Sequence, residues 1–195
     1  MATVRRIAVY CASSDQVHGD YLAAAAGLGR LLARERIAIV YGGGGSGLMG
    51  ALADASLAEG GEVVGVIPRF MDEIEWGHAG LTELHIVEDM HERKRRMLDD
   101  ADAVVALPGG TGTLEELLEA ITLKRLGLFL SPIVLVNIRG FYDPLLRQFD
   151  EAITQRFMDE RHRLMWRVAE RTEDVLAAIR DSPPWDAGAR AFARI

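Results

Sequence analysis

The chain has 195 residues, of which 49% are hydrophobic and 26% charged, a composition typical of a globular domain with a substantial core. Its net charge of −7 argues against nucleic acid and anionic membrane surfaces as partners, because both repel an acidic protein. No apolar run approaches the ~20 residues of a membrane helix. The one cysteine, Cys11, excludes an internal disulfide, which favours a cytoplasmic protein.

Short apolar runs alternate with helical patterns along the chain. The predicted strands cover 7–11, 37–41, 63–67, 84–87, 103–107 and 133–136. The predicted helices cover 21–34, a segment ending near 59, 90–98 with Asp89 as its cap, a segment from 114 onward, 141–157 and 172–180. The polar turn 12–15 either caps a helix or lines a site, and 68–83 is expected to be an irregular loop.

The strands are continuous apolar runs, as expected when helices cover both faces of a sheet. The pattern therefore predicts an α/β fold with a doubly wound parallel sheet, Rossmann-like, in a single domain over residues 1–182. Residues 183–195 are expected to form a mobile tail. Ligands of such sheets bind at the carboxyl ends of the strands, and both glycine-rich turns of this chain follow strands.

The segment from Pro108 to Glu116 reads as the end of a strand, a glycine-rich turn and the start of a helix. Glycines allow backbone N–H groups to turn inward, and a helix N-terminus adds further donors and a positive dipole end. Together they predict a phosphate cradle. Glu115 and Glu116 lie in the first helical turns and point about 100° apart. One is expected to face the ligand and the other solvent or a partner subunit.

A second glycine-rich turn, from Gly42 to Gly50, matches the dinucleotide fingerprint in two frames. The strand that follows ends at Pro68 and Arg69 instead of an acidic residue, which disfavours NAD. An NADP-linked oxidoreductase stays open as an alternative, because Arg69 suits a 2′-phosphate. A tight strand–helix turn without any ligand is the other interpretation.

A basic cluster, Arg93 to Arg96, lies on the predicted helix 90–98. Arg93 is placed to point toward the same sheet edge as Glu116, where its fork suits a phosphate or a sugar. Arg95 and Arg96 are expected to be solvated. No metal site is expected, because the five histidines show no ligand spacing among themselves or with Cys11. These histidines are His18, His78, His85, His91 and His162.

The segment 108–116 resembles the PGGxGTxxE motif of the LOG ("Lonely guy") family of cytokinin riboside 5′-monophosphate phosphoribohydrolases, which are often labelled lysine decarboxylases. Three further stretches agree with that family, namely 41–50, 65–68 and 90–94. The similarity runs in order from the first strand to about residue 157. The sequence departs from the family pattern at Leu123, often tryptophan, and at Arg139, often aspartate, which bears on the preference for the base.

The resemblance implies a usually homodimeric enzyme that needs no cofactor. It splits the N-glycosidic bond of adenine-type nucleoside 5′-monophosphates, AMP or N6-isoprenylated nucleotides, into the base and ribose 5-phosphate. By position, Arg93 and Glu116 match the catalytic residues. The positions that match substrate contacts, or that the glycine turns add to them, are Gly43, Gly44, Glu75, Arg93, Lys94, Gly109, Gly110, Thr111, Gly112, Thr113, Leu114, Glu115 and Thr122.

A binding or carrier protein without turnover is the alternative within this fold, since relatives of the fold carry molybdenum cofactor. The presence of Arg93 and Glu116 favours the enzyme. In the expected mechanism, cleavage builds oxocarbenium-like charge on the ribose, as in glycoside hydrolysis. Glu116 is expected to stabilise that charge and to orient or activate water, while Arg93 positions Glu116.

Overall fold

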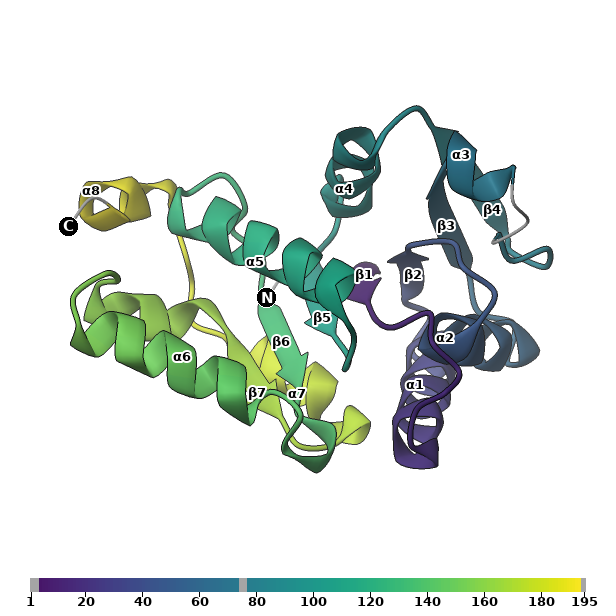
Figure 1. The fold of residues 1–195 in the computed structure, drawn as a ribbon, viewed down its shortest axis with the longest axis horizontal. Coiled ribbons are helices and arrows are strands. Elements are labelled where there is room, and N and C mark those ends of the chain that lie inside the picture. Colours follow the sequence, from purple (N-terminus) through teal and green to yellow (C-terminus); the bar gives the residue numbers. More distant parts are fainter. Residues whose placement is uncertain (1–3, 74–76, 194–195) are drawn as a thin grey trace.

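The computed structural model describes residues 4–73 and 77–193 and contains one sheet in the order β4-β3-β2-β1-β5-β6-β7, with every neighbouring pair parallel (Figure 1). The strands are β1 (Arg6–Tyr10), β2 (Ala38–Tyr41), β3 (Val63–Pro68), β4 (Glu83–Val87), β5 (Ala103–Ala106), β6 (Ile133–Val136) and β7 (Arg167–Ala169). The predicted doubly wound α/β sheet is confirmed. The chain winds outward from β1 to β4 and then restarts at β5 on the other side of β1.

Helices cover both faces of this sheet. They are α1 (Gly19–Arg34), α2 (Gly47–Ala58), α3 (Arg69–Asp72), α4 (Met90–Leu98), α5 (Thr111–Arg125), α6 (Asp143–Thr154), α7 (Val175–Arg180) and α8 (Arg190–Ala193). One core packs α1, α2 and α7 against the sheet, and the other packs α4, α5 and α6 against its opposite face. None of the helices in the described residues is long and apolar enough to cross a membrane.

The observed elements differ from the predicted ones in four places. Within 68–83, residues Arg69–Asp72 form the short helix α3. The helix predicted over 141–157 is confined to Asp143–Thr154, because the chain first makes a 3-10 turn in which Arg139 has a φ of 56°. The segment 172–180 begins as a 3-10 helix. Strand β7 was not predicted, because this edge strand is not a continuous apolar run.

The segment after residue 182 was expected to be mobile, yet its described part folds back onto the carboxyl end of α5. The indole Nε1 of Trp185 donates to the carbonyl of Lys124 at 2.7 Å. Arg125 donates from Nη2 to the carbonyl of Ala193 at 2.6 Å. Figure 1 shows α8 beside that end of α5. Two hydrogen bonds and the partly buried side chain of Trp185 thus hold this segment against the helix.

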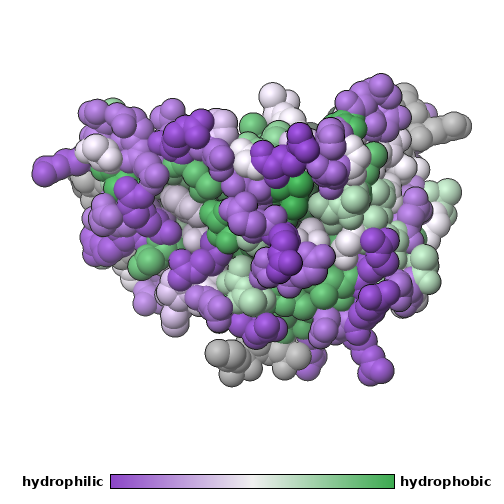
Figure 2. Space-filling view, turned by 90° about the horizontal axis from the view of Figure 1, so that it is seen from below, coloured by the Kyte–Doolittle hydropathy of each residue, from purple (hydrophilic) through white to green (hydrophobic). Residues whose placement is uncertain are grey.

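The surface of the molecule is largely polar. Figure 2 shows one face on which hydrophilic side chains dominate and apolar patches lie between them.

The carboxyl ends of β1 and β5 meet where the winding direction reverses, the place where sheets of this type bind ligands. The loops that follow β1, β2, β3 and β5 therefore build the candidate site.

Candidate active site

Arg93 connects three elements at the carboxyl edge of the sheet. Its side chain enters from α4, whose N-terminus is capped by Asp89 through hydrogen bonds from the amides of His91 and Glu92. The guanidinium donates from Nε to the carbonyl of Val66 at 3.0 Å, from Nη1 to Glu116 Oε1 at 3.0 Å, and from Nη2 to the carbonyl of Gly42 at 3.2 Å. The residue is 6% exposed, so this buried fork fixes both Glu116 and the end of β2.

Glu116 is the buried carboxyl group of the site. It is 4% exposed and lies on the face of α5 turned toward Arg93. Burial raises the pKa of Glu116 to about 7, with Arg93 lowering it and Glu115 raising it further. A carboxyl group that titrates near neutral pH at a sheet edge is suited to acid–base or electrostatic chemistry.

The neighbouring Glu115 faces away from this pair, as adjacent helical residues are expected to do. Its side chain is 54% exposed and accepts a hydrogen bond from Nζ of Lys94, which also lies 3.1 Å from Glu119 Oε2. Although burial disfavours the Lys94 ammonium, its hydrogen bonds to Glu115 and Glu119 raise its pKa. Lys94 therefore connects α4 to the outer side of α5 through ion pairs.

The first glycine turn, residues 42–47, is fixed through its carbonyl groups. Those of Gly42, Gly43 and Gly44 accept hydrogen bonds from Arg93 Nη2 at 3.2 Å, the His78 amide at 2.8 Å and the Tyr41 hydroxyl at 3.1 Å. A Cβ at Gly42 would lie 2.0 Å from Arg93 Nη2, and Gly43 has a φ of 79°. Glycine is therefore required here by the protein's own packing.

The second glycine turn, residues 108–113, is more open. A Cβ at Gly109 would lie 2.1 Å from Thr113 Oγ1, so this glycine admits the Thr113 side chain. A Cβ at Gly110 or at Gly112 would meet no atom within 4 Å. These two residues line free space at the N-terminus of α5, where backbone donors and the helix dipole favour an anion. The geometry fits the predicted phosphate cradle.

The loop after β1 lies between the two turns. The Ala12 amide donates to the carbonyl of Pro108 at 3.3 Å, and the Met49 amide donates to the carbonyl of Ala12 at 3.1 Å. Ser13 and Ser14, which follow, are exposed at the point where the winding reverses. This position adds two hydroxyl groups to the candidate site. The sequence offered this turn both as a helix cap and as a site wall. The first is wrong, because the residue that caps α1 is His18, outside the turn.

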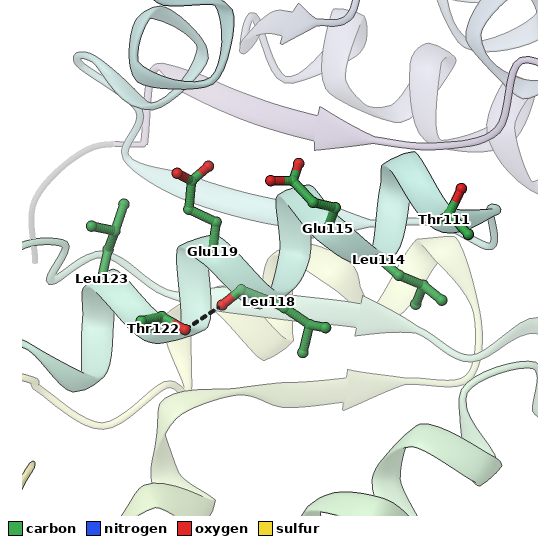
Figure 3. A pocket seen from close by; sticks show the side chains of 7 residues that line it. All are labelled: Thr111, Leu114, Glu115, Leu118, Glu119, Thr122 and Leu123. Atoms are coloured by element: carbon green, nitrogen blue, oxygen red, sulfur yellow. Dashed lines mark hydrogen bonds between the residues drawn. The ribbon is translucent and has the colours of Figure 1, made fainter. Parts of the chain in front are cut away.

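The predicted site residues fall into two groups in the structure. One group surrounds the carboxyl edge of the sheet and comprises Arg93, Glu116, Gly43, Gly44, Gly109, Gly110, Gly112 and Thr113. The other group lies on the outer face of α5, around an open hollow of about 590 Å³ (Figure 3), and comprises Thr111, Leu114, Glu115 and Thr122. Lys94 belongs to this group, because its amine pairs with Glu115 and Glu119. Thr111 begins α5 and borders both regions. Glu75 lies outside the described residues.

Thr122 is not brought to Glu116. It lies six residues beyond Glu116 on α5, roughly 9 Å along the helix axis, and it lines the hollow on the outer face of the helix. Its hydroxyl donates to the carbonyl of Leu118 at 2.7 Å, as Figure 3 shows. Glu116 and Thr122 therefore face different sides of α5, one toward Arg93 and the other toward the hollow.

The site offers no thiol nucleophile, since Cys11 is buried and burial raises the pKa of its thiol. Within residues 4–73 and 77–193, no group of three or more histidine, cysteine, aspartate or glutamate side chains is arranged to hold a metal ion. Arg95 and Arg96 are exposed, as predicted. The chemistry of the site thus centres on one buried carboxyl group, one buried guanidinium and backbone donors.

The comparisons with known proteins agree with this arrangement. A family model described as "Possible lysine decarboxylase" matches residues 49–179. A cytokinin riboside 5′-monophosphate phosphoribohydrolase of Rhodococcoides fascians is 44% identical over 179 residues, covering 91% of this chain and 90% of that protein. A probable enzyme of the same name from Oryza sativa subsp. japonica is 46% identical over 153 residues, covering 78% of this chain and 69% of that protein.

Among solved structures, a molybdenum cofactor carrier protein from Chlamydomonas reinhardtii superposes with a TM-score of 0.70 at 19% sequence identity, covering 91% of this chain and 97% of that chain. At that identity the match establishes the shared fold alone. The family model and the sequence relatives establish the family as well, because the matched residues include the Arg93 helix, the second glycine turn and Glu116. The chain belongs to the LOG family.

Proposed function

We propose that the chain hydrolyses the N-glycosidic bond of adenine-type nucleoside 5′-monophosphates, releasing the free base and ribose 5-phosphate. It is a nucleotide phosphoribohydrolase and therefore an N-glycosyl hydrolase. The observation that carries the proposal is the buried ion pair of Arg93 Nη1 and Glu116 Oε1, which are 3.0 Å apart. The pair lies between the two glycine turns at the carboxyl edge of the sheet. The names of the sequence relatives support the same reaction.

The 5′-phosphate binds at the second glycine turn. Gly110 and Gly112 leave free space there, and the first amides of α5 point to it. The positive end of the helix dipole compensates part of the charge of the phosphate. The ribose then extends from the cradle toward Glu116, one helical turn further along α5, so that the phosphate acts as the anchor that places the reacting carbon.

Glu116 acts in its carboxylate form. Breaking the bond between the base and the anomeric carbon places positive charge on the ribose ring, and a buried carboxylate beside that ring stabilises it. The same carboxylate orients a water molecule and accepts its proton as the water oxygen bonds to the anomeric carbon. The base leaves with the electron pair of the broken bond and takes a proton from solvent, and Glu116 returns its own proton to solvent. Arg93 keeps the carboxylate in place through Nη1 while Val66 and Gly42 hold the guanidinium itself.

The description "Possible lysine decarboxylase" does not fit the lysines of this chain. Decarboxylation of that kind commonly uses a lysine amine to bind pyridoxal phosphate as a Schiff base. Both lysines are engaged elsewhere: Lys94 with Glu115 and Glu119, and Lys124 with the carbonyls of Leu130 and Ser131 at 3.1 Å and 2.6 Å. Neither amine borders the free space at the second glycine turn.

The test is incubation of the purified protein with AMP, with isopentenyladenosine 5′-monophosphate and with adenosine, followed by chromatography of the released base. We expect base from the two monophosphates and none from adenosine, because the nucleoside lacks the anchoring phosphate. The ratio of the two rates names the preferred substrate and decides whether the protein is an AMP nucleosidase. Nucleotide binding without any released base would contradict the proposal and favour a carrier.

The proposal includes a homodimer in the cytoplasm, where nucleoside monophosphates are made. The outer face of α5 supports the dimer, because its hollow is lined by leucines and Leu118 is 40% exposed. Two copies that pack α5 against α5 in antiparallel fashion bring Thr122 of each copy to the N-terminal half of the other helix. This arrangement gives Thr122 access to substrate bound by the partner.

Light scattering at micromolar concentration tests the dimer. We expect twice the mass of the chain, and we expect Leu118→Glu to yield monomers because a charge would be buried at the centre of the interface. Arg95→Glu, a charge change on an exposed position of α4, is the control and leaves the mass unchanged. A monomeric wild-type protein would contradict this part of the proposal without affecting the proposed reaction.

A further inference from the structure

His78 lies outside the Arg93–Glu116 pair, yet it contacts the first glycine turn. Its backbone amide donates to the carbonyl of Gly43 at 2.8 Å, and an antiparallel bridge pairs Gly44 with Gly77. The chain around residues 77–80 therefore runs along the glycine turn as a second layer. Only backbone groups make these contacts, so they depend on whatever holds residues 77–80 in place.

The imidazole of His78 fixes residues 77–80 through two hydrogen bonds. Nδ1 accepts a hydrogen bond from the Gly80 amide at 3.0 Å, so in the neutral ring the proton resides on Nε2. Nε2 donates to Asp54 Oδ1 at 2.9 Å. The side chain of His78 is only 12% exposed, whereas that of Asp54 is 71% exposed. The imidazole thus joins the turn 77–80 to the middle of α2, the helix that begins directly after the glycine turn.

The first two glycines of the turn are consequently held by two different residues. Arg93 binds the Gly42 carbonyl on one side, and His78 binds the Gly43 carbonyl on the other. Gly43 packs closely against β3, because a Cβ on Gly65 would lie only 2.9 Å from the Gly43 Cα. Release of His78 therefore removes the support that residues 77–78 give to Gly43 and Gly44.

We propose that His78 and Asp54 form a positioning pair that holds residues 43–44 in the shape that receives the nucleotide. The inference rests on the proposed function, and it assigns to His78 a role that acts through the glycine turn and not through contact with the reacting bond. Glu116 keeps its place without His78, because Arg93 is held by the Val66 carbonyl as well as by Gly42. Loss of the pair therefore weakens substrate binding and leaves the chemical step nearly intact.

The experiment measures kcat and KM for AMP, together with the dissociation constant of AMP by calorimetry, in the full chain. We expect His78→Ala and Asp54→Ala each to raise KM and the dissociation constant about tenfold, since small displacements of positioning groups have effects of this order. The change in kcat stays within about twofold. The double variant binds AMP no more weakly than either single variant, because both changes remove the same tether.

Two further variants separate positioning from general destabilisation. In His78→Gln the amide N–H can still reach Asp54, so we expect AMP affinity to return most of the way to wild type. His85→Ala is the matched control: His85 pairs with Glu83 at 3.1 Å on the edge strand β4. We expect it to leave KM unchanged. Should His78→Ala fail to fold, Asp54→Ala and His78→Gln decide the question.

Unchanged AMP affinity in the single variants, or additive losses in the double variant, would overturn the proposal. Failure of the proposed function gives a different result, namely no released base from the wild-type protein with any nucleotide. The calorimetric comparison then still decides on His78, because it needs binding and no turnover.

Discussion

The two glycine turns look alike in the sequence and follow β2 and β5, the strands on either side of β1. In the first turn, the missing Cβ of Gly42 makes room for the guanidinium of Arg93. Three consecutive carbonyls there accept hydrogen bonds from Arg93, His78 and Tyr41. In the second turn, Gly110 and Gly112 face free space at the start of a long helix.

This difference separates a turn whose shape is held by the protein's own side chains from a turn that is open to the phosphate. The first turn presents carbonyl groups to the protein and sets the position of Arg93, which sets the position of Glu116. The second turn presents amides and the positive end of α5 outward, where an anion is favoured. A glycine-rich fingerprint therefore marks a tight strand–helix turn, and its surroundings decide whether it binds a ligand.

The largest expected effect comes from the carboxyl group that both turns serve. Glu116→Gln keeps the size and the hydrogen bond to Arg93 but removes the negative charge. We expect turnover of AMP to fall by about a thousandfold or more, in line with the loss of an electrostatic catalytic group. The dissociation constant of AMP, measured by calorimetry, changes by less than about threefold. Full turnover in this variant would refute the role of Glu116.

The next effect tests the first turn as a scaffold. In Gly42→Ala the new methyl group would lie 2.0 Å from Arg93 Nη2, so the guanidinium must leave its place and Glu116 loses its partner. We expect kcat/KM to fall about a hundredfold. Gly19→Ala, at a position with no atom within 4 Å of a Cβ, is the control and retains activity. Wild-type kinetics for Gly42→Ala would show that Arg93 does not need this turn.

The pH dependence tests the state of Glu116. Because burial raises the pKa of Glu116 to about 7 and the carboxylate is the active form, kcat/KM rises with pH below that value and levels off above it. Well below pH 7 we expect about a tenfold loss per unit. The second pKa of a phosphate monoester is about 6, so ionisation of the substrate gives a separate step in the same pH profile. A fall in kcat/KM above pH 7 would instead indicate that the protonated acid is active.

The smallest effect tests the second turn as a cradle. Gly110 has a φ of −82°, which alanine adopts, and a Cβ there points into free space. We expect Gly110→Ala to keep the wild-type melting temperature and to raise KM for AMP several-fold, because the methyl group occupies room for the phosphate. Kinetics and thermal unfolding measure both quantities. An unchanged KM would place the phosphate elsewhere and remove the distinction between the two turns.

Much of this arrangement was predictable because it is local in the sequence. Continuous apolar runs gave six of the strands, and the Asp89 cap gave the start of α4. Arg93 and Glu116 each follow the end of a parallel strand, β4 and β5, so both were expected at the carboxyl edge of the sheet, where they lie 3.0 Å apart. Strand β7 lacked such a signal, because only one of its three residues is buried.

The sequence by itself determined the parallel sheet, the two glycine turns and the identity of the charged pair, since each depends on residues close together in the chain or on the common carboxyl edge of parallel strands. Only the tertiary structure decided which glycines pack against side chains of the protein and which leave space for a ligand. It also decided that Thr122 lies on the outer face of α5, and that His78 reaches Asp54 from 24 residues away. These contacts depend on how helices and loops pack over the sheet, which no local pattern encodes.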